Sequence, residues 1–204
     1  MEHSIGRTTV AGFAVFVGLL VLAAAYFSDN RHTDIDELAL YNSAYMVAHY
    51  GRSTYPAEGW FDLPMIVHPP VHTGTIGLLS RLGLTWYYAA GTPTACFLLL
   101  AIVVIAHGNF PSHVKLALLF GAGLLMTYGE QFATFFGSRP EGTLHSAWFA
   151  ALVVLESARR SDWNRARLFG GAFLLTWASS LHYYAIPALG GIAVYLLGAY
   201  KHSD

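Results

Sequence analysis

The stretch VAGFAVFVGLLVLAAAYF, residues 10–27, contains no charged side chain. At 1.5 Å per residue it spans about 27 Å as a helix, close to the thickness of a bilayer's hydrocarbon core. It is not followed by a small-x-small cleavage site, and the chain after it stays apolar, so we expect a first transmembrane helix and not a removed signal peptide. Of the 204 residues, 55% are hydrophobic and 11% charged, against roughly 25% charged in soluble domains. The composition predicts an integral membrane protein.

Further apolar segments predict an all-α polytopic protein, with residues 1–204 forming a single transmembrane domain. The segment from Val71 to Leu84 is only about 14 residues long and contains Arg81, so we expect it not to cross the membrane. Residues 29–84 then form one large external loop with two helices lying along the membrane surface. The six expected transmembrane helices cover residues 8–28, 85–107, 114–129, 143–157, 168–184 and 187–200. The last two are short, and one kinked hairpin remains an alternative for them.

The basic residues predict the orientation of the chain in a plasma (inner) membrane. ARRSDWNRAR, residues 158–167, carries four arginines, which the positive-inside rule places in the cytoplasm. The N-terminus is then cytoplasmic as well, and the polar loops lie on the external face. Seven of the eleven Lys and Arg residues fall inside in this arrangement, namely Arg7, Lys115, Arg159, Arg160, Arg165, Arg167 and Lys201. The net charge of −1 gives no indication of a nucleic-acid partner.

The first external segment, HTDIDELALYNSAYMVAHYG from residue 32 to 51, has the signals of an amphipathic helix. Asp34 can cap its N-terminus, and Glu37 three residues later completes a pair that resembles a capping box. Gly51 can end it. Acids in a first turn also favour the helix macrodipole, so these carboxylates have a structural explanation beside a chemical one. The apolar positions that recur at helical spacing are Leu38, Tyr41, Tyr45 and Ala48.

Two later external segments carry further polar residues. In IVHPPVHTG, residues 66–74, Pro69 holds His68 extended, and Pro70 suits the first turn of a short helix. In FFGSRPEGTLHSAW, residues 135–148, Arg139 and Glu141 flank Pro140 just outside the membrane, where charges are costly unless paired or used. A carboxylate at this face can act as a general base on a hydroxyl, and a fixed arginine can bind a phosphate. Lipid head groups are the phosphates most available there.

The order of these motifs resembles that of the membrane-embedded C-type glycosyltransferases, especially the protein O-mannosyltransferase and aminoarabinose transferase superfamily. The matching residues are the acidic pair Asp36–Glu37, HPP at 68–70 and RPE at 139–141. LHYYAIPALGGIAVYLLG, residues 181–198, stands where the family has a Lys-Gly-Pro-like turn followed by an apolar span. Here His182 and Tyr183 replace the lysine of that turn. Family members usually continue for several more spans, so the resemblance implies an N-terminal module, truncated or minimal.

The resemblance implies an enzyme that transfers a sugar from a polyprenyl-phosphate donor to a hydroxyl of a lipid, glycan or protein acceptor, with inversion. Asp36 would be the general base, and Arg139 would bind the donor phosphate with His68 near the same group. Glu37 and Glu141 would orient the acceptor, the arginine or a divalent metal. Whether a metal is needed stays open. The implied substrate-binding residues are Glu37, His68, Arg139, Glu141, His182 and Tyr183.

Two other interpretations remain open. A small transporter or metal-handling protein would use histidines and acids such as His68, His72 and Glu141 as ligands or proton relays. Transport predicts polar residues near the bilayer midplane, whereas here they gather at the outer interface, which favours chemistry at the surface. A non-catalytic membrane subunit that stabilises a partner subunit would fit the short chain.

Overall fold

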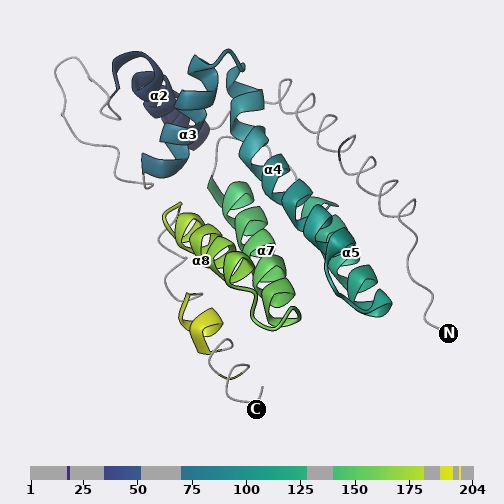
Figure 1. Ribbon diagram of the computed structural model, residues 1–204. Coiled ribbons are helices and arrows are strands. Elements are labelled where there is room, and N and C mark those ends of the chain that lie inside the picture. The colour runs from purple at the N-terminus through teal and green to yellow at the C-terminus, as the bar shows by residue number, and fades with distance from the viewer. Residues whose placement is uncertain are drawn as a thin grey trace.

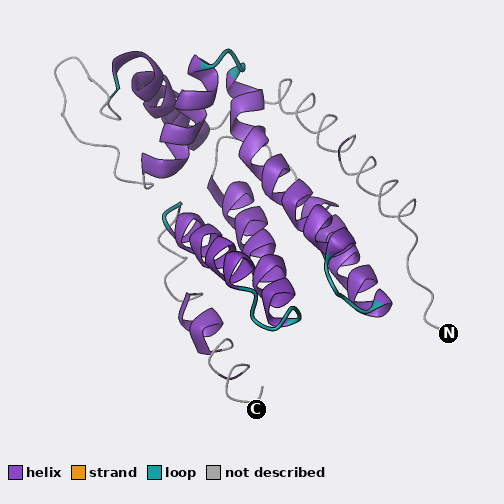
Figure 2. Ribbon diagram, in the orientation of Figure 1, coloured by secondary structure: helices purple, strands orange, loops and turns teal. Residues whose placement is uncertain are grey.

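The structure, a computed structural model, describes residues 18, 35–51, 70–127, 140–181, 189–194 and 198. Within these ranges every regular element is a helix and none is a strand, which confirms the predicted all-α class (Figures 1 and 2). The labelled helices are α2 (Ile35–Tyr50), α3 (Pro70–Arg81), α4 (Trp86–His107), α5 (Ser112–Thr127), α7 (Pro140–Arg159) and α8 (Arg165–Ser179).

Among the described helices, α4 is the one long and apolar enough to cross a membrane, over Tyr88–His107. With 16 and 15 residues, α5 and α8 cover about 24 and 22 Å, less than the roughly 30 Å of a hydrocarbon core. The 20 residues of α7 include charged side chains near both ends. The expected crossings at 8–28 and 187–200 lie largely outside the described residues. The number of crossings therefore stays a prediction.

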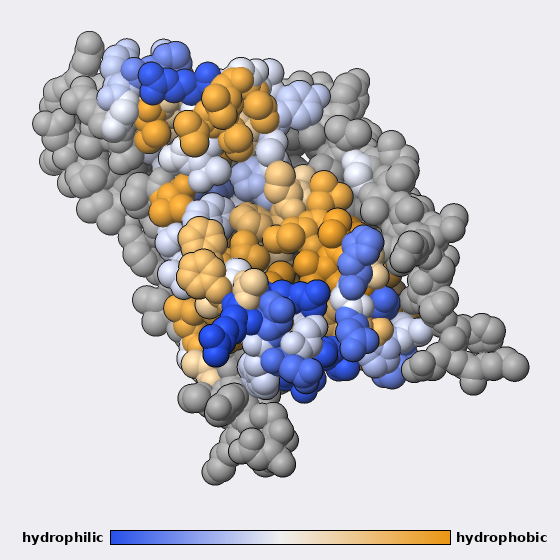
Figure 3. Space-filling model, viewed as in Figure 1, coloured by the Kyte–Doolittle hydropathy of each residue, from blue (hydrophilic) through white to orange (hydrophobic). Residues whose placement is uncertain are grey.

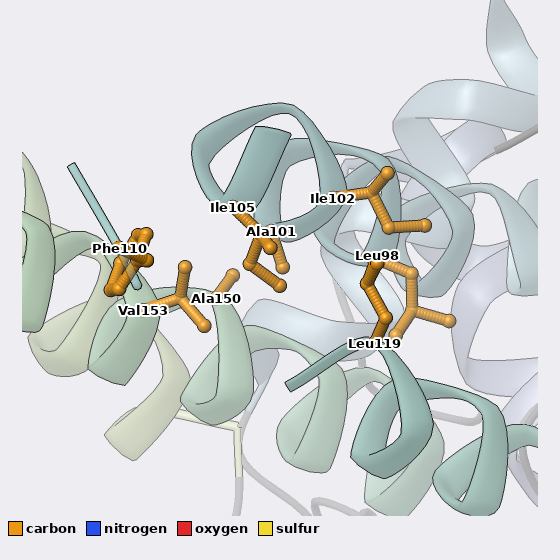
Figure 4. Packing of buried hydrophobic residues seen from close by; sticks show 8 residues of the cluster. All are labelled: Leu98, Ala101, Ile102, Ile105, Phe110, Leu119, Ala150 and Val153. Carbon is orange, nitrogen blue, oxygen red and sulfur yellow. The ribbon is translucent and has the colours of Figure 1, made fainter. Parts of the chain in front are cut away.

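The main core lies between α4 and α7, which run in the same direction. Near their starts, Thr94 of α4 and Thr143 of α7 share a buried hydrogen bond of 3.1 Å. Near their ends, His107 and Ser157 line one small hollow. Between these two contacts, α4 and α7 pack closely because alanines lie among branched side chains in the core (Figure 4). The fully buried cluster consists of Leu98, Ala101, Ile102, Ile105, Phe110, Leu119, Ala150 and Val153.

Helix α8 returns antiparallel to α7 after a tight turn at residues 160–164. Asp162 and Trp163 in this turn have φ of 49° and 55°, a left-handed conformation that reverses the chain within a few residues. Asn164 caps α8 by accepting a hydrogen bond of 3.1 Å from the Arg167 backbone N–H. The two helices pack closely at Gly171, because a Cβ atom there would lie 2.6 Å from Leu155 Cγ.

Helices α2 and α3 form a separate pair beside the first half of α4 (Figure 1). As predicted, α2 ends at Gly51, which has φ of 68° and donates its N–H to the Val47 carbonyl. The buried stripe of α2 matches the predicted one in part: Ala48 is buried as predicted, but Tyr45 is 44% exposed, and Leu40 and Ala44 are buried instead. Small residues face α3 because the helices touch closely. The tyrosine rings pack instead against Trp86.

The packing of α8 on α7 gives a direct test. We expect Gly171→Ala to lower the free energy of unfolding by about 1–3 kcal/mol, because the added methyl overlaps Leu155. Gly170→Ala is the matched control: its Cβ meets no atom within 4 Å, and alanine favours the helix by up to about 1 kcal/mol. Denaturant unfolding of the detergent-purified variants measures both. Equal stability of the two variants would contradict this packing.

Candidate functional site

The starts of α2 and α3 lie at the same end of this helix pair. Gly77 of α3 lies against Ala44 of α2, since a Cβ at Gly77 would be 2.7 Å from the Ala44 carbonyl oxygen. One turn further along both helices, Ala48 and Arg81 line one pocket. The two helices therefore run in the same direction. Counting back at 1.5 Å per residue, each helix begins about 10–13 Å before the contact at Gly77.

The start of α3 meets the start of α7 and the end of α8. Val71, the second residue of α3, packs against a buried cluster made of Leu144 and Ala147 from α7, Ala178 from α8 and Leu181 just after α8. Phe97 of α4 and Trp177 of α8 close the same cluster, with ring centroids 5.0 Å apart. Figure 1 shows these helix ends facing one another below the α2–α3 pair. We call this place the junction.

Several predicted motifs are close in sequence to the described residues of the junction. Asp36 and Glu37 lie in the first turn of α2, on the same side as the start of α3. His68 is two residues before Pro70, Arg139 directly precedes α7, and His182 directly follows Leu181.

The side chains of several predicted site residues fall outside the described part of the chain. His68, Arg139, His182 and Tyr183 lie outside the described residues altogether. For Asp36 and Glu37 the structure describes the helical backbone but not the side chains. The interactions predicted for these six residues therefore stay predictions.

Glu141 is the predicted site residue whose side chain the structure describes. It lies in the first turn of α7 and is half-buried, with Oε2 shielded from solvent and no hydrogen-bond donor for it among the described residues. Three and seven residues later, Leu144 and Trp148 share its helix face, and both contribute to the junction cluster. Glu141 therefore lies on the face of α7 that borders the junction, and its Oε2 has no donor among the described residues.

Sequence analysis missed a set of buried hydroxyl groups in the wall of the junction. Thr94 and Thr143 are almost fully buried and bond to each other, and Ser146 donates to the Thr143 carbonyl oxygen at 3.0 Å. His72 is fully buried as well, in the first turns of α3. The signal for Thr94 was its position in GTPT, residues 91–94, a polar interruption of an apolar helix. Its partner, 49 positions away, had no local signal.

The metal prediction has no direct support from the described residues: within them, no group of three or more His, Cys, Asp or Glu side chains is close enough to hold an ion. Glu37 and Glu141 would be the oxygen ligands of a divalent metal at the junction, as the sequence analysis allowed. Comparisons of the chain with family models, with curated proteins and with solved structures found no match.

The threonine pair at the junction gives a second test. Thr143→Val keeps the shape of the side chain but leaves the buried Thr94 hydroxyl without its partner, so we expect a loss of about 1 kcal/mol in unfolding free energy. The double variant Thr94→Val/Thr143→Val removes both hydroxyls and should be more stable than the sum of the single changes. Denaturant unfolding of all four proteins gives the coupling energy; additive effects would contradict the hydrogen bond.

Proposed function

We propose that this protein is a membrane-embedded glycosyltransferase that moves a sugar from a polyprenyl-phosphate donor to an acceptor hydroxyl on the external face of the plasma (inner) membrane. The observation that carries the proposal is the junction. Val71 of α3, Leu144 of α7 and Leu181, which follows α8, pack into one cluster. Each of them lies within five residues of a motif that the sequence analysis singles out.

The surface of the described helices supports a polytopic membrane protein. Apolar side chains four residues apart point outward on three helices: Leu99 and Val103 on α4, Leu116 and Phe120 on α5, and Phe169 and Phe173 on α8. Phe169 is 75% exposed and Phe120 is 67% exposed. Such stripes promote aggregation in water but are favourable against lipid. Figure 3 shows a hydrophobic belt in the middle of this face, with hydrophilic residues below it and a mixture of hydrophilic and hydrophobic residues above it.

The arrangement of helix ends at the junction supports an anionic substrate. The N-termini of α3 and α7 meet there, and α2 begins on the same side. Backbone N–H groups at helix N-termini have no partner inside the helix and carry partial positive charge, so they attract phosphate. Arg139 directly precedes α7. The guanidinium of this residue would add paired, charge-assisted hydrogen bonds to a donor phosphate.

In the proposed reaction, the acceptor oxygen attacks the anomeric carbon of the sugar from the side opposite the phosphate. The new glycosidic C–O bond forms as the bond from that carbon to the phosphate oxygen breaks, which inverts the configuration. Asp36 takes the proton of the acceptor hydroxyl. Polyprenyl phosphate leaves with the bonding electron pair, and its charge is stabilised by Arg139, by His68 and by the helix N-termini. Glu37, Glu141, His182 and Tyr183 would orient the acceptor and the donor.

The first test of this proposal concerns donor binding. We expect native mass spectrometry of the detergent-purified protein to detect a retained polyprenyl-phosphate lipid, and Arg139→Ala to lose it, because no other arginine adjoins the junction within the described helices. Arg81→Ala is the matched control, since Arg81 ends α3 at the opposite end from the junction. Lipid retained equally by the wild type and Arg139→Ala would contradict the phosphate assignment. A bound divalent metal in place of the lipid would favour the transporter interpretation.

The second test concerns the general base. With a polyprenyl-phosphate sugar and an acceptor alcohol, Asp36→Asn should lower the turnover by about 10²–10⁴-fold while the donor still binds, because the amide cannot accept the proton. Asp34→Asn is the control, since Asp34 is expected to stabilise only the start of the helix, by about 1 kcal/mol or less. Full activity of Asp36→Asn would indicate a subunit without this chemistry.

A further inference from the structure

A second polar site lies at the opposite end of the helix bundle from the junction. A hollow of about 150 Å³ opens where α4 and α7 end and α8 begins. Its lining combines apolar side chains with a cation, an imidazole and a hydroxyl. The apolar residues are Val103, Val104 and Val154, and the polar ones are His107, Ser157 and Arg167.

Arg167 is held in place by neutral oxygens. Its Nη1 donates to Ser157 Oγ at 2.9 Å, to Ser161 Oγ at 2.7 Å and to the Ser157 carbonyl oxygen at 3.5 Å. No described carboxylate lies within ion-pair distance of it. The guanidinium is therefore fixed in direction and keeps its full charge. The donors on Nε and Nη2 form no hydrogen bond within the described residues, and they stay available to a ligand.

Three neighbouring cations already have partners within the protein. Arg159 and Arg160 both bind Glu156, with N–O distances of 2.7 Å. Lys115 donates to the Ala106 carbonyl oxygen at 3.2 Å, at the end of α4. Among the described cations at this end of the bundle, Arg167 is the one that lines the hollow.

The start of α8 adds to this positive charge. Its first turn contains Arg165 and Arg167 and no acid. Cations at a helix N-terminus oppose the macrodipole and cost stability, whereas a bound anion would reverse that effect. At this end of the bundle the described residues include five Lys and Arg side chains but only two acidic side chains, those of Glu156 and Asp162. Figure 3 shows hydrophilic residues gathered here, directly below the hydrophobic belt.

From this geometry we infer that the hollow binds the phosphodiester of an anionic membrane phospholipid. The Arg167 guanidinium would pair with two phosphate oxygens, and the Ser157 hydroxyl and the His107 ring lie in the same wall. The valines beside them would contact the glycerol and the first methylenes of the chains, which a free phosphate lacks. The positive-inside rule places this end in the cytoplasmic leaflet, where anionic lipids concentrate. The inference does not depend on the transferase proposal.

The test is a lipid titration of the delipidated full-length protein, followed by native mass spectrometry. Phosphatidylglycerol should bind the wild type, and Arg167→Gln should weaken this binding roughly fivefold or more, as expected for one cation at a membrane surface. Val103→Trp fills the hollow from an exposed position without changing the charge, so it should weaken binding as well. Arg81→Gln, at the far end of α3, should bind like the wild type.

Three results would overturn the inference. The first is unchanged phosphatidylglycerol binding by both Arg167→Gln and Val103→Trp, each with wild-type circular dichroism. The second is equal binding of phosphatidylcholine with the same acyl chains, because its head group carries no net charge for Arg167 to recognise. The third is displacement of the lipid by inorganic phosphate over the same concentration range, which would assign the hollow to a free phosphate.

Discussion

The packing of α4 against α7 in the same direction is the constraint on which the rest of the structure depends. A chain that forms two neighbouring parallel helices must return between the end of the first and the start of the second. Helix α5 is the described part of this return segment, and its Leu119 packs in the core shared with α4 and α7. The hydrogen bond between Thr94 and Thr143 joins the two helices near the start of α7. Because α3 runs back along the first half of α4, its start reaches the level where α7 begins. The junction is a consequence of this register, and a shift of one helical turn would separate Val71 from Leu144.

Close contact between helices is achieved in the same way at two separate places. Gly77 lets α3 touch the backbone of α2 at Ala44, and Gly171 lets α8 touch Leu155 of α7. Glycine exposes backbone atoms to a neighbouring helix, so the two helices gain dispersion contacts at close range. Larger apolar side chains fill the rest of the core, where Ile76, Leu98 and Ile102 are almost fully buried between the helices. The apolar stripes of α4, α5 and α8 face outward in addition to this core.

Local signals in the sequence predicted the helix ends well and the tertiary contacts poorly. Gly51 and Pro70 marked the end of α2 and the start of α3, because each acts through its own backbone. The buried face of α2 was predicted from the spacing of large apolar residues, but Tyr45 is exposed, and Ala44 and Val47 are the residues that lie against Gly77. The Thr94–Thr143 pair could not be predicted, as neither threonine has a local partner. Of the candidate site, Glu141 was predicted and faces the junction, whereas the shielding of its carboxylate depends on packing.

The charges in the first turns of the helices distinguish the two ends of the bundle. At the junction, α2 and α7 begin with acids, which stabilise each helix but repel a phosphate. A phosphate can bind there only if Arg139 and the free N–H groups outweigh those acids, and the acids then remain near a reacting centre as bases. At the other end, α8 begins with two arginines and no acid. A site with both signs of charge suits proton transfer next to a leaving anion, whereas a site with cations alone can bind an anion but has no base. Chemistry is therefore expected at the junction, and lipid binding at the hollow beside Arg167.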